Sequence, residues 1–107
     1  MKLTNTCFRE RIAHKPEGAI TLGFLDFTLT FGKVNIEING AAVRLTSDGR
    51  PAVSFPSRPW EGRDGTTRYT RVVRLDENAY ARLVRDVFAL ALVQRAVHTA
   101  EHAREAA

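Results

Sequence analysis

Apolar and polar residues alternate along most of the first 75 positions, a pattern typical of β-strands that bury one face. Residues 2–12 alternate loosely and are rich in Thr and Phe, so we expect an edge strand with Cys7 or Phe8 turned inward. The segment 14–18 contains both proline and glycine, which predicts a turn before the next strand.

The segment 19–39 continues the alternation as one long strand or two short ones, but its apolar positions change parity twice. A shift of one residue would otherwise exchange the buried and exposed faces, so each change needs a structural correction. At Gly32 we expect a bulge or bend, and near Leu25 a tight connection. The dipeptide Asn39-Gly40 predicts a turn.

Shorter segments complete the predicted sheet. The sequence Ser-Asp-Gly at 47–49 is typical of a hairpin turn, with short strands expected at 43–45 and 52–55. Residues 57–67 contain two glycines and a proline, and we expect an exposed loop there. A strand predicted at 68–75 has no purely apolar face, as in an edge strand.

A C-terminal helix is predicted from residue 76 to residue 98, because apolar residues there recur at spacings of three and four. Asp76 stands at the N-cap position, and Glu77 follows at the positive end of the helix dipole. Leu90 and Val93 fall outside the main apolar stripe, and we expect them to face a second subunit. The stripe itself should cover the sheet and consists of Tyr80, Leu83, Val84, Val87, Phe88, Ala91 and Leu92.

The predicted fold class is α+β: an antiparallel sheet of hairpins packed by one C-terminal α-helix. A chain of 107 residues has the size of one domain, so we expect a single unit spanning 1–107. Residues 1–75 form the sheet, 76–98 the helix and 99–107 a tail that continues the helix or frays. The apolar positions outside the stripe and the edge-like first and last strands predict a two-fold homodimer.

Positive charge is concentrated between residues 50 and 75. This stretch contains six arginines and two acidic residues, an excess of four that equals the net charge of +4 for the whole chain. Arginine binds phosphate in a planar fork, and interleaved aromatic rings can stack on bases, which favours a nucleic-acid surface. The alternative is a solvated hairpin with polar cross-strand pairs. The candidate nucleic-acid contacts are Arg58, Trp60, Arg63, Arg68, Tyr69, Arg71 and Arg74.

Several segments between Gly18 and Leu92 resemble the SpoVG family, the stage V sporulation protein G or septation regulator proteins. They are GAITL at 18–22, VNIEING at 34–40, FPSR at 55–58 and the dipeptide Asp64-Gly65. The resemblance implies a small dimeric protein that binds DNA or RNA and regulates expression. By matching position, it implies that Arg58 and Arg68 contact nucleic acid.

The sequence favours no enzyme and no cofactor. His98 and His102 lie in an H-x-x-E-H pattern, the inverted zincin motif, but the third ligand expected downstream is missing before Ala107. We therefore expect a solvated helix face there, with neither a metal site nor catalytic residues. Cys7 has no His at a recognisable spacing and is expected to be a small buried apolar residue.

A second class of function remains open: a homodimeric protein-interaction module whose arginines only keep it in solution. The single cysteine and the lack of a basic-then-apolar leader predict a cytoplasmic protein. No apolar run is long enough to cross a bilayer, so no membrane partner is expected.

Overall fold

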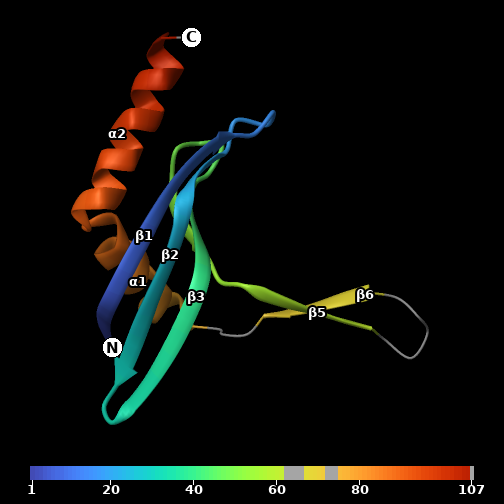
Figure 1. Cartoon of the computed structure of the whole chain (residues 1–107), viewed down its shortest axis with the longest axis vertical. Helices are drawn as coiled ribbons and strands as arrows, with labels where there is room; N and C mark the ends of the chain where they lie inside the picture. Colours follow the sequence, from blue (N-terminus) through green and yellow to red (C-terminus); the bar gives the residue numbers. More distant parts are fainter. Residues whose placement is uncertain (62–66, 72–74, 107) are drawn as a thin grey trace.

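The computed structural model describes residues 1–61, 67–71 and 75–106, with the backbone alone described at 57–61, 67–71 and 104–106. Within these residues the chain forms a four-stranded antiparallel sheet, a separate two-stranded ribbon and two helices (Figure 1). In chain order the elements are β1 (Lys2–His14), β2 (Ile20–Phe31), β3 (Val34–Leu45), β4 (Pro51–Ser54), β5 (Ser57–Glu61), β6 (Thr67–Arg71), α1 (Glu77–Phe88) and α2 (Ala91–Ala106).

The larger sheet is a meander in which each strand pairs with the next, in the order β1-β2-β3-β4. Both helices lie on one face of it, with α2 packed on β1 and β2 and α1 packed on β4 (Figure 1). The core between the layers is apolar, and no buried polar residue occurs in the part of the chain whose side chains are described. The α+β class and the antiparallel sheet are therefore confirmed.

The two parity changes in 19–39 have different structural origins. Gly32 lies in the two-residue turn that joins β2 to β3, with a φ of 59°, so the expected bulge or bend is a tight hairpin turn. The tight connection expected near Leu25 is wrong, because β2 runs without a break from Ile20 to Phe31. Register shifts between Thr21 and Gly23 and between Leu25 and Phe27 realign the faces instead.

The turn predicted at Asn39-Gly40 is also wrong, because both residues lie inside β3. Leu25 pairs with Ala41 and Phe27 pairs with Ile38, so two residues of β3 stand opposite the single residue Asp26. This is a β-bulge, and Gly40 occupies its left-handed position with a φ of 80°. The Asn-Gly signal therefore marks a strand irregularity in this chain.

The first strand is an edge strand, as predicted, since β1 pairs only with β2 in the larger sheet. Phe8 packs against the core, but Cys7 is exposed, so the burial expected for this cysteine is wrong. Strand alternation explains the difference, because neighbouring residues point to opposite faces and only one of the two can meet the helices.

The shorter hairpin was predicted correctly. The Thr46 N–H donates a hydrogen bond of 2.8 Å to the Arg50 carbonyl, and the strands on either side of 47–49 pair through Val43 and Val53. The short strand expected at 43–45 is the last part of the longer strand β3, whereas the one expected at 52–55 corresponds to β4. Residues 57–61 form β5, so this half of the expected loop 57–67 is a strand. The strand expected at 68–75 corresponds to β6, which ends at Arg71.

Helix α1 begins where its sequence predicts. The Asp76 carboxylate accepts a hydrogen bond of 2.8 Å from the Ala79 N–H, which satisfies one of the free donors of the first turn. Within α1, Leu83, Val84 and Val87 are buried as expected from the stripe.

The prediction of a single helix is wrong, because α1 ends at Phe88 and a second helix starts at Ala91. Because of this interruption, the apolar positions of α2 do not continue the stripe of α1. Leu92 is 55% exposed, whereas Val93 is fully buried. Val93 is therefore not available for a second subunit, and Leu90 is partly buried against the core. Helix α2 continues to Ala106, through most of the segment expected to be a tail.

The side chain of Tyr80 joins α1 to the edge of the sheet. Its hydroxyl accepts a hydrogen bond of 3.0 Å from the Val53 N–H and donates one of 2.9 Å to the Val53 carbonyl. Backbone groups at the outer edge of β4 are thereby satisfied within the chain. This contact fixes where α1 begins on the sheet and protects the edge of β4 against pairing with another strand.

At Gly23, β2 leaves no room for a side chain beside β1. A Cβ atom there would lie 2.2 Å from the Arg9 carbonyl oxygen and 2.8 Å from Cζ of Phe8. Because the first of these atoms belongs to the backbone, we predict that Gly23→Ala lowers the free energy of unfolding by about 2 kcal/mol or more. Urea unfolding followed by circular dichroism measures the loss.

Gly32→Asn is the matched control for this substitution. A Cβ atom at position 32 meets nothing within 4 Å, and asparagine tolerates the left-handed backbone of this turn. Its cost should stay below about 1 kcal/mol. Equal destabilisation by the two variants would contradict the steric origin assigned to Gly23.

Candidate nucleic-acid interface

The β5–β6 ribbon projects from the rest of the molecule as an arm (Figure 1). It is a sheet of its own, and the described backbone of the arm approaches the larger sheet and the helices at few points. The arm follows soon after β4, and its two strands carry three of the six arginines of the positively charged stretch, Arg58, Arg68 and Arg71. The fold therefore presents this stretch on a narrow ribbon rather than on the surface of the body.

The register of the arm brings several candidate residues to neighbouring positions. Trp60 pairs with Arg68, and Arg58 pairs with Thr70. Cross-strand partners share a face and alternate residues return to it, so these four positions belong to one face of the ribbon. Arg58, Trp60 and Arg68 therefore occupy positions of the same face.

The opposite face of the arm is formed by the other set of pairs. Tyr69 stands across from Pro59 and Arg71 across from Ser57. Arg63 and Arg74 lie outside the described residues. The structure thus brings five of the seven candidate contacts onto the arm, three at positions of one face and two at positions of the other.

Arg50, the first arginine of the positively charged stretch, belongs to the body. Its Nε lies 3.0 Å from Oδ2 of Asp48 in the turn between β3 and β4, and both side chains are largely exposed. A hydrogen bond from the Thr46 hydroxyl, and then the charge of Arg50, lower the pKa of Asp48. The charge of Arg50 is thus partly offset within its own turn.

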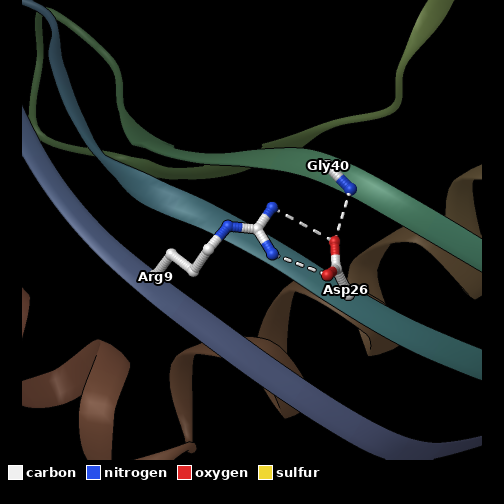
Figure 2. Close-up of polar contacts among 3 residues, drawn as sticks. All are labelled: Arg9, Asp26 and Gly40. Atoms are coloured by element: carbon white, nitrogen blue, oxygen red, sulfur yellow. Dashed lines mark hydrogen bonds and ion pairs between the residues drawn. The ribbon is translucent and has the colours of Figure 1, made fainter.

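A polar cluster of Arg9, Asp26 and Gly40 lies where β1, β2 and β3 run side by side (Figure 2). Arg9 donates two hydrogen bonds to the Asp26 carboxylate, of 2.6 Å from Nη1 to Oδ2 and 3.3 Å from Nη2 to Oδ1. The Gly40 N–H donates a third, of 2.8 Å, to Oδ1. One carboxylate therefore ties the edge strand to the bulge of β3.

The charges in this cluster support one another. The hydrogen bond from Arg9, followed by the one from Gly40, lowers the pKa of Asp26, and the same carboxylate raises the pKa of Arg9. With three donors directed at it, the carboxylate acts as a structural clamp. The sequence does not reveal this cluster, because Asn39-Gly40 is typical of a turn and only the bulge places Gly40 opposite Asp26.

The two histidines of the H-x-x-E-H pattern lie on α2. His98 and His102 are both exposed, with ring centres 4.5 Å apart. Over the residues with described side chains, no three His, Cys, Asp or Glu residues gather closely enough to hold a metal ion together. In the same part of the chain, no helix is long and apolar enough to span a membrane.

Comparison of this chain with models of protein families, with curated proteins and with solved structures finds no match.

Because folding lowers the pKa of Asp26, the stability of the protein should depend on pH. A carboxylate with a pKa lowered by folding stabilises the protein above its unfolded-state pKa of about 4, and this stabilisation is lost as the pH falls through the folded-state value. We therefore predict that Asp26→Asn is less stable than the parent at neutral pH. The difference should shrink steadily in acid, as measured by urea unfolding from about pH 7 to pH 2.

Glu37→Gln serves as the control, because it removes one negative charge from the same sheet without touching the Arg9 and Gly40 contacts. It should unfold close to the parent at neutral pH. A stability difference between Asp26→Asn and the parent that stayed constant over the whole pH range would rule out the charged clamp.

Proposed function

We propose that this chain is a small nucleic-acid-binding regulatory protein, similar to the SpoVG family, that binds DNA or RNA through the β5–β6 arm. The observation that carries the proposal is the register of the arm, which groups Arg58, Trp60 and Arg68 at positions of one face. Guanidinium groups bind phosphate oxygens, and an indole offers a surface for base stacking.

The shape of the arm is compatible with both kinds of nucleic acid. A two-stranded β-ribbon fits the major groove of B-form DNA, where its arginines can reach phosphates on either side. On a single strand, phosphate contacts by arginine and stacking by Trp60 suffice for binding without sequence preference. The proposal therefore names the surface and the chemistry, and the choice between duplex and single strand is an outcome of the experiment.

An isolated two-stranded ribbon is at best marginally stable in water. Because the arm pairs with no strand of the larger sheet, a bound partner is a natural source of additional stability. We propose nucleic acid as that partner, with two copies of the chain acting as a homodimer. In such a dimer two arms double the number of phosphate contacts and bind more tightly than one.

The resemblance noted in the sequence supports the same function. Its two implied contacts, Arg58 and Arg68, occupy the same face of the ribbon, one on each strand. The resemblance and the register therefore agree on the surface.

A protein-interaction module without nucleic-acid affinity is the alternative. It is favoured by β1, a strand of 13 residues at the edge of the larger sheet, which offers backbone groups to a further strand. The same binding titrations decide between the two functions, because a pure interaction module binds no oligonucleotide even at low salt. Light scattering on the same samples gives the oligomeric state.

We predict that binding depends steeply on salt. If Arg58, Arg68, Arg71 and Arg74 each meet a phosphate, a dimer makes about eight contacts, and its affinity for duplex should fall about 10⁴-fold between about 50 and 200 mM salt. Replacing Arg68 and Arg71 with Ala removes half of these contacts, so the fall should shrink to about 10²-fold. Fluorescence anisotropy with labelled oligonucleotides across salt measures both slopes.

The control is Arg82→Ala/Arg85→Ala on the exposed side of α1. Both double variants change the net charge equally, from +4 by two units to +2, but only one changes the arm. The control should retain the steep slope of the parent. If the Arg68/Arg71 variant, folded by circular dichroism, bound both duplex and single strands as the parent does, the proposal would be wrong.

Trp60→Ala should change the affinity for single strands more than the affinity for duplex. If its ring stacks on an unpaired base, the substitution costs about 1–3 kcal/mol of binding on single strands and little on duplex. Arg68→Ala should instead weaken both, since phosphate contacts carry no information about base identity. A Trp60→Ala variant that lowered the melting temperature and left single-strand affinity intact would assign this ring to packing within the protein.

A further inference from the structure

Two histidines stand one helical turn apart on the outer side of α2. His98 and His102 are both exposed, and the centres of their rings lie 4.5 Å apart with the ring planes inclined by 38°. Residues separated by four positions are neighbours on a helix surface. The same spacing serves two zinc ligands in helical metalloprotease motifs.

The ring separation suits a shared metal ion. An ion ~2.0–2.1 Å from one nitrogen of each imidazole lies ~3 Å from each ring centre. With the ring centres 4.5 Å apart, the two metal–nitrogen bonds then meet at roughly a right angle. Adjacent positions in octahedral or tetragonal coordination have this angle, which is the preference of Ni²⁺ and Cu²⁺.

The opposite side of the helix holds these histidines in place. Ala96 and Ala100, which flank His98 along the chain, are fully buried against the sheet. The backbone that carries the pair is therefore anchored by the core, so it keeps the two histidines at neighbouring positions. Such preorganisation reduces the entropy lost when both rings bind one ion.

The charged neighbours of the pair act in opposite directions. Arg95 lies one turn before His98 and repels a cation, whereas the exposed carboxylate of Glu101 lies one turn after His98 and attracts it. These two charges offset each other to first order. The affinity should therefore be set mainly by the two imidazole nitrogens.

We propose that His98 and His102 form a two-nitrogen binding site for a divalent late first-row transition-metal ion, with water at its other coordination positions. A bound ion would link two side chains one turn apart on α2. The site is separate from the β5–β6 arm. It differs from the inverted zincin site suggested by the sequence pattern, because it needs no third protein ligand and performs no hydrolysis.

Calorimetric titration with Ni²⁺ alone, in a buffer that does not bind metal, tests the site. The full chain should bind one ion per chain with a dissociation constant on the order of 10 μM. His98→Ala and His102→Ala should each weaken binding at least ~10-fold, because either change leaves a single ligand. The double variant should be little weaker than either single one, and His14→Ala should bind as the parent does.

A change of spacing separates chelation from the mere presence of two histidines. His102→Ala/Ala103→His keeps the number of imidazoles but moves the second one off the face of His98, since residues five apart are not neighbours on a helix. This variant should bind as weakly as His102→Ala. Far-UV circular dichroism on each variant confirms that α2 is intact.

Three results would overturn the site. They are single variants that bind within about threefold of the parent, a spacing variant that binds as tightly as the parent, and no Ni²⁺ binding by the parent at millimolar concentration, on the order of 10⁻³ M.

Discussion

The sheet depends on the way β2 and β3 keep their apolar faces aligned across the bulge at Gly40. Without the extra residue, every side chain of β3 beyond Ile38 would move to the opposite face, and Ala41 and Val43 would leave the core. Asp26 stabilises the bulge by accepting the Gly40 N–H, and Arg9 holds the same carboxylate from the neighbouring strand. The clamp is polar and accessible to solvent, yet it maintains the register on which the buried face relies.

The helices complete the core through two different kinds of contact. Helix α1 is positioned by direction-specific hydrogen bonds, between Tyr80 and the backbone of Val53. Helix α2 is positioned by the small size of two buried side chains, because Ala96 and Ala100 allow a close approach to β1 and β2. The break between the helices lets each meet a different part of the sheet. Helix α2 therefore buries one side in the core and carries the histidine pair on its other side.

The division of the molecule into body and arm underlies the proposed function. Among the residues with described side chains, the core is formed by the four strands of the larger sheet and the two helices, while β5 and β6 form a sheet of their own. The arm can then consist of arginine, aromatic and small polar residues at a spacing suited to an external partner. Concentrating charge on a separate ribbon also keeps the repulsion between arginines away from the packed layers.

The sequence by itself determined the α+β class, the N-cap at Asp76, the turn at 47–49 and the concentration of arginine between residues 50 and 75. Each of these rests on chemistry that acts within a few residues, such as side-chain capping, strand alternation or turn preference. Only the tertiary structure decided the bulge at Gly40, the exposure of Cys7 and the pairing of Trp60 with Arg68. The break after Phe88 belongs to the same group, since neither proline nor glycine marks it. These features depend on which distant segment packs against a residue, and a local pattern contains no information about that partner.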